Sequence, residues 1–135
     1  MRADLIAAAV IDACALVAQG GDAGTAAARL GTVEGRDAAG GLILVKPARE
    51  PWGAVQVLAD GGRVAGLVLD VPEGHEAPLP ALAVVLGDGA EDRPLDAPRP
   101  VFLFDPPGTG CRVIAEVEPG PDGGWLAHRF KIATL

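Results

Sequence analysis

Cysteine and histidine are the side chains of this sequence whose chemistry would be easiest to recognise. Cys14 and Cys111 lie far apart and match no metal-ligand spacing such as C-x-x-C. This favours two buried free thiols, which pack as small hydrophobic side chains. The alternative is a long-range disulfide, which needs an oxidising compartment. The chain contains no serine, so a serine nucleophile is excluded, and no histidine is spaced to identify a partner for Cys111.

The two histidines also favour structural roles. His75 lies in a proline-rich connection between Glu73 and Glu76, but one histidine and two carboxylates do not make the ligand set of a structural zinc site. His128 alternates with Phe130 and Ile132, so we expect it on the apolar side of a strand, as a hydrogen-bonded core or sheet-edge residue and not a catalyst. We therefore expect no catalytic residue, no metal and no cofactor. Whether the chain is an enzyme stays open, and a noncatalytic role is favoured.

The two tryptophans are the strongest candidates for a binding surface. Trp52 and Trp125 each flank an expected strand beside a glycine-containing turn, where an indole can either close the end of the core or stand exposed as an anchor. Arg49 and Glu50 share the loop of Trp52 and would form its polar rim. The segment 105–111 lacks the Lys-Ser/Thr and the following helix of a phosphate-binding loop, so it is expected to be a hairpin turn. The candidate binding residues are Trp52, Arg49, Pro107, Trp125 and Arg129.

Charge narrows the class of partner. The 135 residues carry 18 acidic and 11 basic side chains, a formal net charge of -7. Without a basic stripe, nucleic-acid binding is not expected, and a partner should be a neutral or basic protein. Asp4 and Asp12 interrupt the apolar N-terminal run, and no run approaches the ~20 residues of a membrane span. We therefore expect neither a secretory signal nor a membrane span, and a cytoplasmic protein.

Hydrophobic periodicity predicts the elements that must position these residues. The first nineteen residues predict an amphipathic helix that ends at Gly20-Gly21 and buries Ile6, Val10, Ala13, Cys14 and Val17. Asp22 is placed to N-cap a second helix that ends at Gly31, and a third helix is predicted over 80–86. Short apolar runs bounded by turn residues predict strands over 42–45, 54–58, 64–71, 101–104, 112–117 and 125–133. The expected fold is one α+β domain, 1–135, with helices on one face of an antiparallel sheet of about six strands.

The two halves of the chain share landmarks in the same order. Leu-Gly pairs at 30–31 and 86–87, prolines at 47 and 106, and glycine pairs at 61–62 and 123–124 follow one another in this way. Such recurrence is typical of a duplicated unit. The alternative is chance recurrence in a chain with 19 glycines. We expect a helical N-terminus over 1–21 and two similar units over 22–72 and 79–135.

The unit resembles the repeat of the beta-lactamase inhibitor protein family and of the related small lipoproteins of outer-membrane assembly. The segments that carry the resemblance are AARLG, LILVKP, WGAVQVLADGG and RVAGLVLDV in the first half, and VVLG, VFLFDP, CRVIAEVEP and GGWLAHRFKIA in the second. The resemblance implies a helical layer on one face of an antiparallel sheet. This chain departs from the inhibitors because it has no cysteine pair in each half and no tyrosine, so no binding residue is transferred.

Two functions follow as expectations. The preferred one is a noncatalytic protein-interaction module, such as an inhibitor, immunity or assembly-accessory protein, that uses the open face of the sheet and the loops around Trp52, Pro107 and Trp125. The alternative is a small-molecule-binding protein or minor enzyme, with a pocket between the helices and the sheet that contains Cys111 or His128.

Overall fold

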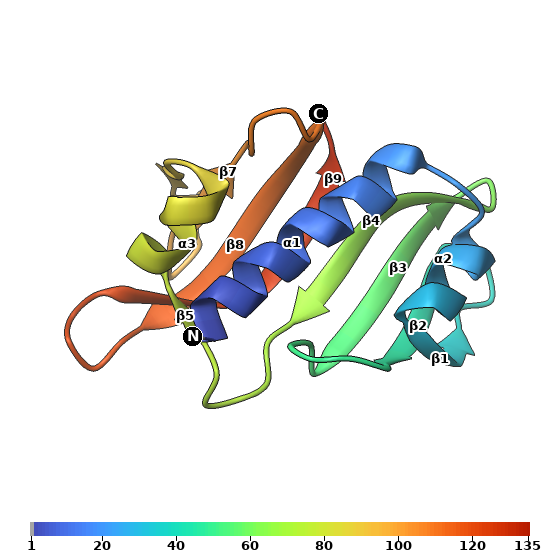
Figure 1. Ribbon diagram of the computed structural model, residues 1–135, viewed down its shortest axis with the longest axis horizontal. Helices are drawn as coiled ribbons and strands as arrows, with labels where there is room; N and C mark the ends of the chain where they lie inside the picture. The colour runs from blue at the N-terminus through green and yellow to red at the C-terminus, as the bar shows by residue number, and fades with distance from the viewer. Residues whose placement is uncertain (1) are drawn as a thin grey trace.

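The structure is a computed structural model that describes residues 2–135 and is shown in Figure 1. The helices are α1 (Arg2–Gln19), α2 (Ala23–Leu30) and α3 (Leu79–Leu86). The strands are β1 (Gly31–Arg36), β2 (Leu42–Pro47), β3 (Ala54–Asp60), β4 (Arg63–Asp70), β5 (Ala77–Pro78), β6 (Ala90–Asp92), β7 (Val101–Phe104), β8 (Cys111–Pro119) and β9 (Trp125–Thr134). The expected α+β class with an antiparallel sheet is confirmed.

All strand pairs of the sheet are antiparallel. The strand order is β1-β2-β3-β4-β9-β8-β7-β6, and β5 adds to the first part of β9. Gly61 and Gly62 join β3 to β4 with φ angles of 60° and 80°, which a tight hairpin turn requires and glycine adopts without steric cost. This confirms the hairpin predicted at Asp60-Gly61-Gly62. The strands β4 and β9 meet at the centre of the sheet.

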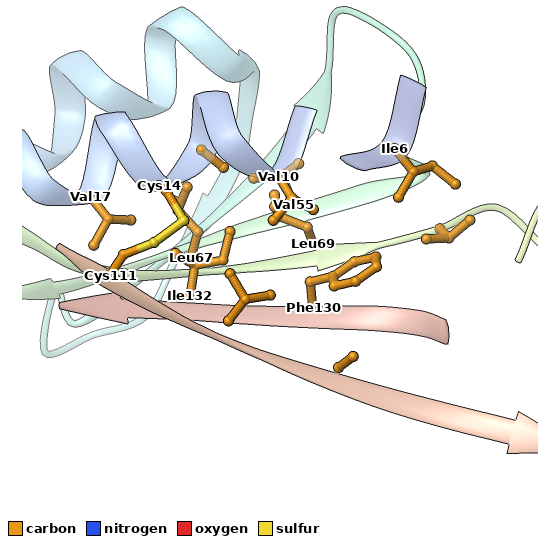
Figure 2. Close-up of a cluster of buried hydrophobic side chains, with 14 of the residues drawn as sticks. Ile6, Val10, Cys14, Val17, Val55, Leu67, Leu69, Cys111, Phe130 and Ile132 are labelled. Carbon is orange, nitrogen blue, oxygen red and sulfur yellow. A yellow bond between two sulfur atoms is a disulfide. The ribbon is translucent and has the colours of Figure 1, made fainter. Parts of the chain in front are cut away.

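The three helices lie on one face of the sheet (Figure 1). The long helix α1 runs across β4, β8 and β9, α2 packs across β1 to β4, and α3 packs against α1, β5 and β9. The predicted apolar face of α1 is confirmed, because Ile6, Val10, Cys14 and Val17 are fully buried and Ala13 is 5% exposed. Figure 2 shows Ile6, Val10, Cys14 and Val17 pointing toward the central strands. The helix layer and the sheet thus share one core.

The number of strands was underestimated, since the sequence predicted about six and the structure has nine. The additional strands are β1, β5 and β6. The strands β5 and β6 have two and three residues, too few to create a periodic pattern. The strand β1 is a polar edge strand, Gly-Thr-Val-Glu-Gly-Arg, with a bulge between Val33 and Gly35. Its pairing is decided by β2 and not by its own hydrophobicity.

The favoured state of the cysteines was wrong. Cys14 of α1 and Cys111 at the start of β8 are both fully buried, as expected, but their sulfur atoms form a disulfide with a Cα–Cα distance of 5.7 Å. The yellow bond in Figure 2 joins the helix to the sheet. Packing of α1 on β8 brings the two residues within the normal range for such a bond, a proximity that local sequence patterns do not encode.

The N-cap of α2 predicts a pH dependence. Asp22 accepts a hydrogen bond from the Thr25 backbone N–H at 2.9 Å, and this bond lowers the carboxyl pKa below its ordinary value of 3.8. A lowered pKa in the folded state contributes stability that is complete above the unfolded-state pKa and is lost as pH falls through the folded one. We therefore expect wild type to lose stability relative to Asp22→Asn below about pH 4. Thermal melts of both proteins between pH 7 and pH 2 would measure this, and parallel pH profiles would contradict it.

Candidate functional site

Among residues 2–135, no helix packs on the face of the sheet opposite α1, α2 and α3. Side chains on a strand point alternately to its two faces, so the neighbours of the core residues define this open face. One row crosses the sheet through paired residues in the order Leu44, Gln56, Val68, Lys131, Ile114 and Leu103. Leu44 and Leu58 are 42% and 37% exposed. Both leucines lie on the same side of the central strands, and Ile114 and Leu103 on the other side are partly exposed.

Four charged residues form a ladder at the centre of the open face. Arg129 donates a hydrogen bond to Asp70 on β4 and lies 3.7 Å from Glu116 on β8, and Lys131 lies 2.9 Å from Glu116. The bond to Asp70 is the main reason that the pKa of Arg129 is raised above its ordinary value. Two cations and two carboxylates cancel within the ladder. The open face thus presents exposed leucines beside a centre whose charges balance, which favours a protein over a charged small molecule as the molecule that binds there.

His128 lies on the other side of the sheet from the one predicted. The pairing shifts between Glu116, opposite Arg129, and Val117, opposite Ala127, so His128 is the extra residue of a β-bulge. Ala127 is fully buried in its place, and His128 is partly exposed. It borders a shallow depression of about 330 Å³ with Arg99, Val101 and Glu116. The simple alternation used for the prediction fails at the bulge, because one inserted residue reverses the faces.

Trp52, Arg49 and Glu50 come together as expected, but in a small space. They border a pocket of about 190 Å³ with Asp12 of α1 and Arg29 of α2. The indole is partly buried, packs against the core, and meets the Phe130 ring edge-on with centroids 5.9 Å apart. Trp52 thus closes one end of the core. The pocket is smaller than the roughly 300 Å³ that drug-sized ligands need.

Trp125 and Pro107 lie far from each other. Trp125 pairs with Pro119 at one end of β8, whereas Pro107 is exposed in the loop before Cys111 at the other end. The nine residues of β8 separate them by about 27 Å. Arg129 lies on the open face, and Trp52 packs on the opposite face against Phe130. The five predicted binding residues therefore do not form one site.

The cysteine and histidine side chains considered as catalytic or metal-binding groups do not form a catalytic or metal-binding cluster. The Cys111 sulfur is buried in the disulfide, and Glu76 accepts a hydrogen bond from the Gly74 N–H beside His75. Among residues 2–135, no group of three or more histidine, cysteine or acidic side chains is arranged to hold a metal ion. In the same part of the chain, no helix has the length and apolar character needed to cross a membrane.

Sequence reasoning missed most of the open face. Leu44 is part of the wholly apolar run Leu-Ile-Leu-Val, in which the outward residue looks like its buried neighbours. Leu58 follows Val55, Gln56 and Val57, whose alternation could have identified it as outward. The pairing of Asp70 and Glu116 with Arg129 depends on strands that are distant in the sequence, so no local signal could have found it.

We found no match to this chain among protein-family models, curated proteins or solved structures.

Proposed function

We propose that the chain is a noncatalytic protein-interaction module, of the kind that serves as an inhibitor, immunity or assembly-accessory protein, and that the open face of its sheet is the binding surface. The observation that carries this is the uncovered face itself. It presents the exposed Leu44 and Leu58, with Ile114 and Leu103 beyond the central ladder. Exposed apolar side chains on a face that no helix covers favour a surface to which a second protein binds.

The central ladder supports a protein as the occupant. Its charges satisfy one another across β4, β9 and β8, so a partner can cover it without leaving an unpaired ion. It also provides geometric specificity, because a partner must place polar groups over Arg129 and Lys131 and apolar groups over Leu44. A neutral or basic protein remains the expected class.

The architecture of the module is proposed to be a duplication. The element orders α2-β1-β2-β3-β4 and α3-β6-β7-β8-β9 support this, as do two eight-residue helices that both end at a Leu-Gly pair. The last strand of each half, β4 and β9, pairs with the other at the centre. This arrangement supports the proposed resemblance to the repeats of the inhibitor and lipoprotein families.

The alternative function, a small-molecule or enzymatic pocket between helices and sheet, loses the two residues on which it was based. Cys111 is held in a buried disulfide, and His128 lies at the bulge beside Glu116 and Arg99. Two pockets are bordered by both α1 and α2, one of about 190 Å³ at Trp52 and one of about 150 Å³ at Val64. Both are smaller than the roughly 300 Å³ that a ligand site needs, so neither favours a substrate site.

Substitutions on the two faces test the proposed function. The full chain serves as bait at low and high salt, and the double variant Leu44→Asp with Leu58→Asp is compared with Leu5→Asp on α1. All three leucines are more than one third exposed, so the fold should survive. We expect proteins retained by wild type and by Leu5→Asp to be lost by the double variant, with at least a tenfold decrease in affinity. Equal retention by all three proteins would contradict a role for the open face.

The cellular compartment of the protein is also a proposal. The sequence predicts a cytoplasmic protein, whereas the disulfide between Cys14 and Cys111 is a bond that persists mainly in oxidising compartments. Trapping free thiols with an alkylating reagent during cell lysis would distinguish the two locations.

A further inference from the structure

A second apolar surface lies on the helix side, around α3. This helix, Leu-Pro-Ala-Leu-Ala-Val-Val-Leu, has no polar side chain, although Val84 is 82% and Val85 42% exposed. A helix that is hydrophobic all round is normally buried on all sides. Part of α3 is therefore surface that the chain itself leaves uncovered.

Two adjoining depressions lie beside α3. One, of about 340 Å³, lies between α3 and β7 and is bordered by Pro80, Ala83, Phe102 and Phe104. The other, of about 380 Å³, continues past the start of α3 to Pro78, Trp125 and Leu126. Pro80 borders both. We call the combined surface the α3 groove, and define it by Ala83, Phe102, Phe104, Pro78, Pro80 and Trp125.

The charged residues that border the two depressions are both acidic. Asp88 is the charged residue that borders the first depression, and Asp122 is the one that borders the second. Glu91 pairs with Phe102 across β6 and β7, on the same face of the sheet. Arg93 is the nearest cation along the chain and lies 3.8 Å from Glu91. An apolar floor thus lies between acidic residues at both ends.

From this complementarity we propose that the α3 groove binds an amphipathic helical segment of a partner protein, with the apolar face of the segment on Pro80, Phe102 and Trp125 and with basic side chains next to Asp88 and Asp122. The proposal rests on the proposed interaction function but uses a different surface from the open face. Recognition of a helix by an apolar groove is a common mode of peptide binding. A second copy of this chain fits poorly, because two acidic rims would face each other.

A designed peptide tests the proposal directly. The probe is a fluorescent Leu/Lys peptide of about 14 residues, or four helical turns, with leucines on one face. A Leu/Glu peptide of the same pattern and a Leu/Lys peptide with scrambled order serve as controls. Anisotropy titrations of the full-length protein should show binding of the patterned basic probe at least tenfold tighter than of either control. Binding should weaken when salt rises from about 0.05 M to about 0.5 M.

Three variants localise the binding. Ala83→Lys places a cation in the groove, Asp88→Lys reverses a charge at its rim, and Glu34→Lys makes the same reversal on exposed β1 at the far edge of the sheet. We expect the first two to weaken probe binding roughly tenfold and the third to change it less than twofold. Thermal melts confirm that each variant is folded.

Three outcomes would overturn the proposal. Equal weakening by Glu34→Lys and Asp88→Lys would mean that net charge alone attracts the probe. Unchanged binding in Ala83→Lys would place the probe elsewhere, and a dimer in light scattering that Ala83→Lys dissociates would mean that a second copy covers the groove. The open-face double variant Leu44→Asp with Leu58→Asp should bind the probe like wild type, so a failure of the open-face function and a failure of the groove give different results.

Discussion

Replacing Cys14 and Cys111 together with alanine is expected to lower the free energy of unfolding by roughly 4 kcal/mol and the melting temperature by roughly 10–15 °C. The disulfide joins residues that are 97 positions apart in sequence. Closing so long a loop restricts the unfolded chain strongly, and that restriction is the main source of the stabilisation. Because typical domains are stable by only 5–15 kcal/mol, the loss would be a large share of the total.

The position of the bond makes this effect larger than that of a surface disulfide. It attaches α1 to the start of β8, and both cysteines are fully buried in the core. The helix α1 also packs on β4 and β9, so its detachment would expose the apolar side chains beneath it. Alanine is the better replacement for this test, because serine would bury an additional hydroxyl group.

Chemical reduction provides the control. A reductant should lower the stability of wild type toward that of the double variant in urea or thermal unfolding, and it should leave the double variant unchanged. If the reductant has no effect on wild type and labelling detects two free thiols in the unfolded protein, the bond is absent. The two cysteines would then be the free thiols that the sequence favoured.

The parts of the fold that the sequence predicted are those with local signals. The buried face of α1 follows from side chains spaced at the helical period, and the β3–β4 hairpin follows from Gly61 and Gly62 between two apolar runs. The end of α3 is marked by Gly87, with a φ angle of 87°. Each of these features is determined by residues that are close together in the sequence.

The parts that the sequence missed depend on pairing with another element of the fold. The strand β6 is exposed and acidic, and it is a strand only because β7 pairs with it. Cys111 meets Cys14 only after α1 has packed on the sheet, and the bulge that turns His128 away from the core forms only where β9 pairs with β8. The common cause is pairing with another element, which overrides the local pattern in each.

The candidate site shows the same division. The expectation that Trp52 and Arg49 share one location follows from their closeness in sequence, and they do border one pocket. Whether Pro107 and Trp125 lie together depends on the topology, which places them at opposite ends of β8. Trp125 borders the α3 groove, so we still propose it as a binding residue. The residues that border the groove with it were not indicated by the sequence.

Replacing Phe130 with alanine is the second change for which we expect a large effect, a loss of about 3–5 kcal/mol in the free energy of unfolding. Phe130 is fully buried on the central strand β9, between Leu69 of β4 and Ala115 of β8. Its ring also supports the edge-on contact with Trp52, at a centroid distance of 5.9 Å, so the variant leaves a cavity and releases the indole.

Phe102→Ala is the matched control, because Phe102 is only partly buried on β7 near the edge of the sheet, and its removal should cost about 1–2 kcal/mol. Urea unfolding of both variants measures the difference. In a Trp125→Phe background, the emission of Trp52 should shift to longer wavelength in Phe130→Ala and stay unchanged in Phe102→Ala. Equal losses of stability, or an unshifted Trp52 emission in Phe130→Ala, would show that Phe130 does not hold this end of the core together, and the assignment of Trp52 as its closing residue would then be wrong.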